Sequence, residues 1–249
     1  MFRKAGLLFC LLVVCPVSQA RQIDVIVGWA KPPYVISDTH SGFELELTRT
    51  VLTKLGHDMA AIYVPFGRTA GLLEAGAGDI GLTLNTHHNI NPEYLTDVYV
   101  IYQNAVITLA SRNLQIETIA DLNKYTVIGF QTAAQLLGDE FAKVVSGKSS
   151  YIEIPEQSRQ VSLLLLGSVD AVVMDRHIFA HMKMHMPQIQ QHATVVHPLF
   201  GISPYRAGII DPELRRQFDE ELALMKADGR YQSLLDRFGL TNLLSQLPE

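Results

Sequence analysis

Residues 23–56 read IDVIVGWAKPPYVISDTHSGFELELTRTVLTKLG, and this stretch decides the class of fold. Residues 23–28 form a β-branched run with apolar and polar alternation, which predicts a strand, and the Lys-Pro-Pro-Tyr segment at 31–34 ends it. From Gly42 to Gly56, apolar residues recur at four-residue spacing and a glycine closes the run. That pattern predicts a helix with one apolar face. The stretch is therefore one strand followed by one helix.

The same strand and helix unit recurs along the rest of the chain. Further strands are predicted at 59–64, 79–84, 125–130, 151–154 and 171–174, and further helical segments at 69–75, 119–122, 132–145, 158–166, 177–184, 212–227 and 230–238. Alternation at this spacing is typical of a mainly parallel sheet with helices on both faces. We therefore expect an α/β protein.

The first twenty residues differ in composition from the rest. Arg3 and Lys4 precede an apolar run at residues 6–14, and Ser18 and Ala20 supply the small side chains of a cleavage site. This pattern predicts a secretory signal peptide at residues 1–20. The alternative, a membrane anchor, is disfavoured because the run is shorter than the roughly 20 apolar residues that a spanning helix needs. We expect an exported chain without stable membrane insertion.

Cysteine content and charge exclude several classes of protein. Both cysteines, Cys10 and Cys15, lie in the predicted signal peptide, so the mature chain has neither a disulfide framework nor a thiolate metal site. Acidic residues number 25 against 20 basic ones, and removal of Arg3 and Lys4 lowers the net charge to −7. Such a charge repels polyanions, so nucleic acid is not expected as a partner. Roughly 230 mature residues suit one large domain or two lobes.

Several short motifs follow one another in a specific order. They are Pro-Pro-Tyr at 32–34, Gly-Phe-Glu-Leu-Glu-Leu at 42–47, Gly-Asp at 78–79, Thr-Ile-Ala-Asp-Leu at 118–122, Val-Ile-Gly-Phe-Gln-Thr at 127–132, Gly-Ser-Val-Asp-Ala at 167–171, Ala-Asp-Gly-Arg-Tyr at 227–231 and Arg-Phe-Gly at 237–239. Each motif alone is weak. Their collinear order resembles the bacterial extracellular solute-binding proteins, family 3, the polar amino-acid class.

The resemblance implies a two-lobed periplasmic binding protein fold of type II. Each lobe would be a mixed, mainly parallel sheet flanked by helices, and two hinge strands would join the lobes. Lobe 1 would comprise residues 21–106 and 201–249, and lobe 2 residues 107–200. The hinges would lie near 104–110 and 197–203. The ligand would bind between the lobes, where strand ends face each other.

The resemblance also implies which side chains bind the ligand. Tyr34 and Phe66 match aromatic positions, whose ring faces cover apolar or cationic parts of a ligand. Asp175 matches an acid that accepts hydrogen bonds from a ligand amino group. The alternatives are that the two aromatic residues are plain core residues and that Asp175 caps the helix that begins at Arg176.

Two threonines are further candidates. Thr132 begins a helix of the second lobe, where its hydroxyl and the backbone amides would receive an anion. Thr86 matches a hydroxyl position of the family. Either threonine could instead be a simple helix cap.

The main departure from the family pattern is a missing arginine. Amino-acid binders of the family carry an arginine soon after the third strand, which grips the ligand carboxylate with a bidentate fork. Residues 79–111 contain no Arg or Lys, and the aligned position falls within Asn-Ile-Asn at 89–91. Arg68 is a possible substitute, unless it forms an ion pair, and so is His87 or His88. The missing arginine is also explained if the ligand is a cation or an amine that has no anionic group to bind.

A histidine series raises the question of a metal. His177, His181 and His185 recur at four-residue spacing, with methionines between them, and one helix face could present them to copper or zinc. A solvated histidine-rich helix face meets the same pattern, and Pro187 ends the helix early. We expect no metal and no cofactor.

The residues and the resemblance together predict a function. We expect a periplasmic solute-binding protein, a monomer, that captures a small polar solute, amino-acid-like or an amine, for an inner-membrane ABC importer. One alternative is a ligand-sensing partner of a membrane receptor. Another is a periplasmic enzyme on the same fold, similar to cyclohexadienyl dehydratases. Because no nucleophile elbow, Walker loop or His-Glu-x-x-His pattern occurs, we do not expect an enzyme.

Overall fold

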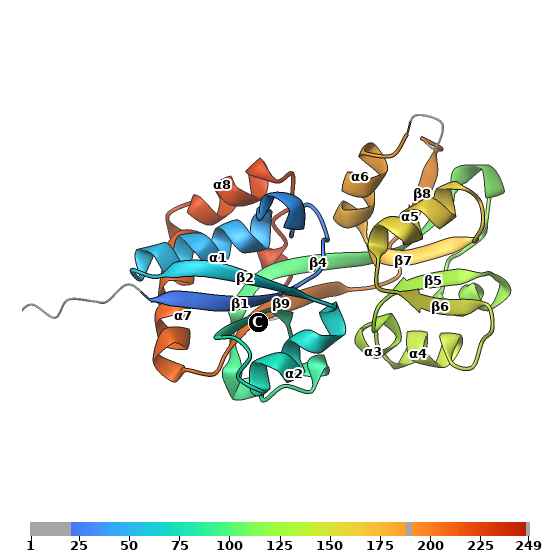
Figure 1. The fold of residues 1–249 in the computed structure, drawn as a ribbon. Coiled ribbons are helices and arrows are strands. Elements are labelled where there is room, and N and C mark those ends of the chain that lie inside the picture. Colours follow the sequence, from blue (N-terminus) through green and yellow to red (C-terminus); the bar gives the residue numbers. More distant parts are fainter. Residues whose placement is uncertain (1–20, 188–190, 248–249) are drawn as a thin grey trace, which may run out of the picture.

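The computed structural model describes residues 21–187 and 191–247, and Figure 1 shows its fold. The predicted signal peptide, residues 1–20, lies outside the described residues. The strands are β1 (Gln22–Gly28), β2 (Asp58–Val64), β3 (Ile80–Leu84), β4 (Leu95–Leu109), β5 (Val127–Phe130), β6 (Tyr151–Ile154), β7 (Ala171–Asp175), β8 (Thr194–His197) and β9 (Ile202–Ile209). The α-helices are α1 (Phe43–Lys54), α2 (Thr69–Glu74), α3 (Ala133–Leu136), α4 (Asp139–Val145), α5 (Gln157–Leu165), α6 (Arg176–Met184), α7 (Pro212–Ala227) and α8 (Arg230–Arg237).

The strands form two parallel blocks joined by antiparallel strands. In one block β1 pairs in parallel with β2 and β3, and in the other β5 pairs in parallel with β6 and β7. The order β2-β1-β3-β9-β4-β7-β5-β6 places the antiparallel strands β9 and β4 between the blocks. Figure 1 shows the first block with α1, α2, α7 and α8, and the second with α3 to α6. The protein is therefore α/β and two-lobed.

Strand β4 runs through both lobes. Its residues 95–103 pair with β9, its residues 104–108 pair with β7, and its residues 106–109 pair with β8. The change of partner falls between Gln103 and Asn104. A second link, from His197 at the end of β8 to Ile202 at the start of β9, also joins the lobes. The two connections lie side by side at the centre of the molecule (Figure 1).

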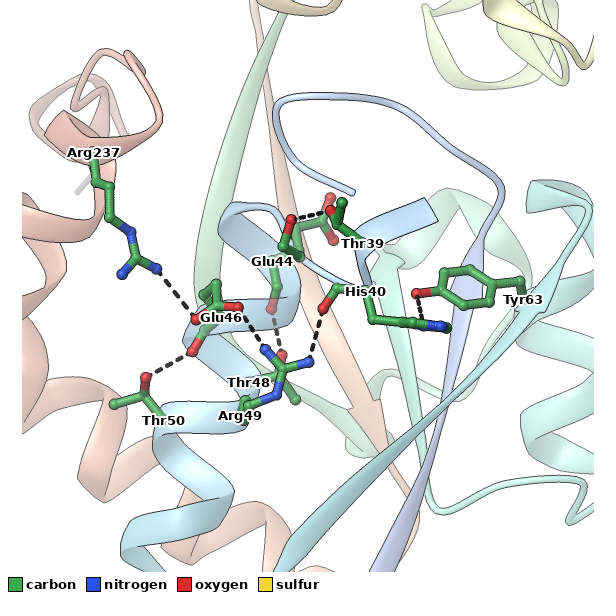
Figure 2. A network of polar contacts seen from close by, with 10 residues as sticks. Thr39, His40, Glu44, Glu46, Thr48, Arg49, Thr50, Tyr63 and Arg237 are labelled. Atoms are coloured by element: carbon green, nitrogen blue, oxygen red, sulfur yellow. Dashed lines mark hydrogen bonds and ion pairs between the residues drawn. The ribbon is translucent and has the colours of Figure 1, made fainter. Parts of the chain in front are cut away.

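Helix α1 has one face in the core and one at the surface. Phe43, Leu47 and Val51 are fully buried, as the four-residue spacing predicts. Figure 2 shows Glu46 with its partners Arg49 and Arg237. The Glu46 carboxylate lies 2.6 Å from an Arg49 nitrogen and 3.2 Å from an Arg237 nitrogen, so it links α1 to α8. The other acidic residue of the same motif, Glu44, is fully buried.

The helix predicted at 132–145 is interrupted. The chain forms α3 and α4 instead, with Gly138 between them at φ 94°, in the left-handed region that glycine adopts without a steric penalty. The prediction of one helix was wrong because the apolar residues on both sides of Gly138 maintain a helical pattern that the backbone does not follow. This break leaves α3 as a single turn whose N-terminus faces β6.

Candidate functional site

A cleft lies where the two lobes meet. Residues from both lobes and from the connecting strands line it: Trp29, Ala30, Lys31, Phe66, Thr83, Tyr102, Asn104, Phe130, Gln131, Pro155, Gln157, Asp175, Ile178 and Tyr205. Five of them are aromatic and only two carry a full charge. A small molecule with a flat or apolar part and few polar groups fits this lining.

Asp175 lies at the end of β7 with its side chain buried against the backbone. Its Oδ1 accepts hydrogen bonds from the backbone N–H groups of His177, at 2.8 Å, and Ile178, at 3.0 Å. Its Oδ2 accepts one from Gln103, at 2.7 Å. Burial raises the pKa of Asp175 to about 6, although these amides favour the charged form. Asp175 therefore caps α6, lines the cleft and holds the point where β4 changes partner.

A buried ion pair forms one wall of the cleft, and sequence reasoning missed it. The Lys31 ammonium lies 3.2 Å from Glu44 Oε1 and donates a hydrogen bond to the Thr83 hydroxyl. It also lies 5.3 Å from the centre of the Phe66 ring and 5.5 Å from that of Tyr102. Both distances fall within the range of cation–π attraction. Lys31, the only lysine that lines the cleft in the described part of the chain, is thus already paired inside the protein.

Glu44 is the centre of this buried network. Its carboxylate accepts hydrogen bonds from three hydroxyl groups, those of Thr83, Tyr99 and Tyr102. Burial alone would raise the pKa of Glu44, but the charge of Lys31 and the three hydroxyl donors outweigh it and lower the pKa. The carboxylate therefore stays ionised although it is shielded from solvent.

Thr83 takes an unusual backbone conformation at the end of β3. Its φ of 60° lies in the left-handed region, which β-branched residues rarely adopt. Its N–H donates to the Tyr99 hydroxyl at 3.0 Å, and the pairing of β3 with β9 is irregular between Gly81 and Leu84. Such strain persists where the surroundings fix it. Here it turns the Thr83 hydroxyl to both Lys31 and Glu44.

The N-terminus of α3 is occupied by a carboxylate of the chain itself. Glu153, on β6, accepts hydrogen bonds from the backbone N–H of Thr132 at 2.7 Å and of Ala134 at 2.9 Å. The Tyr151 hydroxyl donates to the same carboxylate at 2.9 Å. The backbone groups with which Thr132 was expected to receive a ligand anion are therefore already used, and Thr132 is not part of the lining.

Of the side chains predicted to bind ligand, Phe66 and Asp175 lie together in the cleft. Tyr34 is 1% exposed, and its ring stacks at 4.0 Å on Tyr102, which lines the cleft. The remaining three candidates, all exposed and outside the lining, are Arg68, Thr86 and His87.

His87 nevertheless takes part in a contact between the lobes. Its backbone carbonyl accepts a hydrogen bond of 2.6 Å from the side-chain amide of Gln135, on α3. The two residues come from opposite lobes, so this bond joins them on one side of the cleft.

The histidine series of α6 is divided between two environments. The His177 ring lies 3.4 Å from the hydroxyls of Tyr34 and Thr241. The rings of His181 and His185 stack on each other at 4.6 Å and line an adjoining groove, which shares Trp29, Ala30, Pro155 and Gln157 with the cleft. Within residues 21–187 and 191–247, no three or more His, Cys, Asp or Glu residues are placed to hold a metal ion. In the same part of the chain, no helix has the length and apolar character needed to cross a membrane.

Comparison with known proteins agrees with this architecture. The model of bacterial extracellular solute-binding proteins, family 3, matches residues 23–241. A histidine kinase sensor domain with similarity to periplasmic binding proteins is 18% identical, with a TM-score of 0.74 over 88% of this chain and 96% of that one. No curated protein sequence matches the chain.

Two solved binding proteins are similar in the same way. An ancestral arginine-binding protein bound to glutamine is 22% identical, with a TM-score of 0.72 over 87% of this chain and 97% of that one. An amino acid ABC transporter substrate-binding protein from Streptococcus pneumoniae, bound to L-arginine, is 17% identical, with a TM-score of 0.70 over 87% and 93%. At these identities the likeness establishes the fold, which is that of the periplasmic binding proteins.

Proposed function

The chain belongs to the bacterial extracellular solute-binding proteins, family 3, and we propose that it captures a small polar solute, amino-acid-like or an amine, in the cleft between its lobes. The observation that carries this proposal is the cleft itself, because both lobes and the connecting strands contribute to its lining. A solute held there contacts both lobes at once and stabilises the closed arrangement. The role is binding rather than catalysis.

Closure of the lobes is the working motion in this proposal. We place lobe 1 at residues 21–106 and 201–249, and lobe 2 at residues 107–200, so only the segments around β4 and the β8–β9 link cross between them. Two connections of this kind permit a hinge motion about the cleft. Asp175 supports one of them through its bond to the Gln103 backbone.

We further propose that the mature chain is a periplasmic monomer that delivers its solute to an inner-membrane ABC importer. The predicted signal peptide at residues 1–20 supports export. The similar protein from Streptococcus pneumoniae, an ABC transporter substrate-binding protein, supports the importer as partner.

Ligand-dependent stabilisation tests the proposal directly. The mature chain is screened by thermal shift against amino acids, amines, small acids and sugars, with small-angle scattering on each hit. A ligand at about 100 times its Kd adds about 2.7 kcal/mol to the free energy of unfolding. We expect at least one compound to stabilise the protein and to reduce its radius of gyration. If no compound does either, the protein is not a solute-binding clamp.

A sensing role is the second candidate, because a histidine kinase sensor domain has the same fold. The two roles differ in the membrane partner rather than in the cleft. Crosslinking of the ligand-bound chain in its own membrane, followed by mass spectrometry, identifies that partner. Capture of a transporter permease supports delivery, whereas capture of a receptor supports sensing.

A further inference from the structure

The charges and hydrogen-bonding groups of the cleft specify the class of solute. We infer that the cleft selects a small organic cation that has no carboxylate group, such as a biogenic amine. This inference rests on the proposed function, because it names the ligand of the same cleft.

The cleft carries one uncompensated charge, and it is negative. Its two charged lining residues are Lys31 and Asp175. Lys31 is paired with Glu44, so those two charges cancel inside the protein. Among the described residues, the only basic nitrogen within 4 Å of the Asp175 carboxylate is His177 Nδ1, at 3.8 Å. Burial lowers the pKa of His177 to about 4, which leaves that ring neutral near pH 7.

The other groups of the lining suit a cation that donates hydrogen bonds. Besides Phe66 and Tyr102, whose rings already lie near Lys31, the lining includes the aromatic rings of Trp29, Phe130 and Tyr205, and ring faces attract cations. The side-chain carbonyl oxygens of Gln131 and Gln157 are buried without a donor among the described residues, and both residues line the cleft. Ammonium and guanidinium N–H groups are donors of the kind that such acceptors lack.

The positions that would receive a ligand carboxylate are absent or filled. Among the residues that the structure describes, no arginine lines the cleft. The Lys31 ammonium already donates to Thr83 and is paired with Glu44. The backbone amides at the start of α3 hold the carboxylate of Glu153. A carboxylate brought into this cleft would lose its water, meet the charge of Asp175 and find no free cation.

Matched pairs of compounds test the inference, because each pair differs only by the α-carboxylate. Isothermal titration near pH 7 compares agmatine with arginine, histamine with histidine, and tyramine with tyrosine on the mature chain. We expect at least one amine to bind, and to bind about a hundredfold more tightly than its amino acid, because the carboxylate of the amino acid would face the like charge of Asp175. An amino acid that binds as tightly as its amine, or tighter, overturns the inference and leaves the binding function intact.

Two variants and one control distinguish the effect of the Asp175 charge from that of the occupied backbone amides of α3. Asp175→Asn is expected to weaken the amine by about thirtyfold or more, because it removes the unpaired charge. Glu153→Ala frees the backbone amides of α3 and is expected to reduce the ratio between the affinities of the amine and its amino acid. Glu140 is an exposed acid in the first turn of α4, and Glu140→Ala is the control that is expected to leave this ratio unchanged. If Glu153→Ala fails to fold, the comparison of amines with amino acids on the unaltered chain still tests the inference.

Failure of the inference and failure of the proposed function give different results. Binding of a neutral or anionic solute without binding of any cation contradicts the inference alone. Absence of binding and of closure across the whole panel contradicts the binding function, and the inference with it.

Discussion

The Oδ2 atom of Asp175 accepts a hydrogen bond of 2.7 Å from the backbone N–H of Gln103. Gln103 is the last residue of β4 that pairs with β9, and Asp175 ends the strand to which β4 pairs next. One buried carboxylate therefore joins the cleft to the crossing between the lobes. Its protonation is expected to affect both stability and binding, in opposite directions.

The first prediction concerns the stability of the ligand-free protein. The pKa of Asp175 is about 6 in the folded chain, above its ordinary value of 3.8, so the folded chain binds this proton more tightly than the unfolded chain. The contribution of Asp175 is greatest at low pH and is lost as the pH rises from about 4 to about 6, by roughly 3 kcal/mol. The Asp175→Asn variant lacks this pH-dependent contribution to the free energy of unfolding. The stability difference between the parent and this variant should therefore grow in favour of the parent as the pH falls.

Urea denaturation at about pH 7 and about pH 4 measures that difference. His88 and His177 have lowered pKa values and give the opposite slope, but both proteins contain them. Repeating the comparison in a His177→Gln background removes the titrating neighbour of Asp175. A difference that does not change with pH would contradict the assignment of a raised pKa to Asp175.

The second prediction concerns the pH dependence of ligand affinity. If the solute is a cation, it binds the ionised form of Asp175, whose pKa is about 6. Lowering the pH from about 7 to about 5 should therefore weaken binding roughly tenfold. Titration calorimetry at both pH values measures this change with the amine that binds best. The Asp175→Asn variant should show little pH dependence, and an affinity that rises as the pH falls would rule out this role of Asp175.

Most helices and strands could be predicted from the sequence because hydrophobic periodicity is local. Strand β4 was expected only as part of a hinge, since Asp97, Gln103 and Asn104 interrupt its apolar pattern and its pairing is entirely long-range. The break at Gly138 depends on a left-handed backbone conformation that a run of apolar residues conceals. Local patterns thus predict elements better than their partners.

The site was predictable only in part for the same reason. Phe66 and Asp175 follow from the family motifs, whereas Lys31 lies in a loop and meets Glu44 only after the chain folds. One signal was present, because Glu44 is flanked by apolar residues on the buried face of α1. The sequence around Glu153 contains no such signal, because its contact with Thr132 joins a strand to a helix start 21 residues away.

The third prediction concerns the buried ion pair. Lys31→Met leaves the carboxylate of Glu44 buried without a cation, which should lower the free energy of unfolding by about 3–5 kcal/mol. The double variant Lys31→Met/Glu44→Gln should be less destabilised than the single one, because no unpaired charge remains. Arg49→Met is the matched control: it breaks the partly exposed pair with Glu46 seen in Figure 2 and should cost less than about 1 kcal/mol.

Urea denaturation of the four proteins of the cycle, Glu44→Gln included, yields the coupling energy. Additive losses would show that Lys31 and Glu44 do not stabilise each other. A loss in Lys31→Met no larger than that in Arg49→Met would show that Glu44 reaches solvent.

The fourth prediction concerns the contact between the lobes. The Gln135 side-chain amide donates to the His87 carbonyl at 2.6 Å, across the cleft and outside its lining. Gln135→Ala removes this bond, which forms only when the lobes are closed. Closure then loses about 1 kcal/mol, which ligand binding must supply, so the Kd of the ligand should rise about fivefold. The stability of the ligand-free protein in urea should change little, because the bond joins exposed groups. Gln232→Ala, which removes an exposed amide bonded to Asp236 and Asn242, is the control and should leave the Kd unchanged. Equal Kd values for the two variants would mean that the contact between His87 and Gln135 does not help to close the lobes.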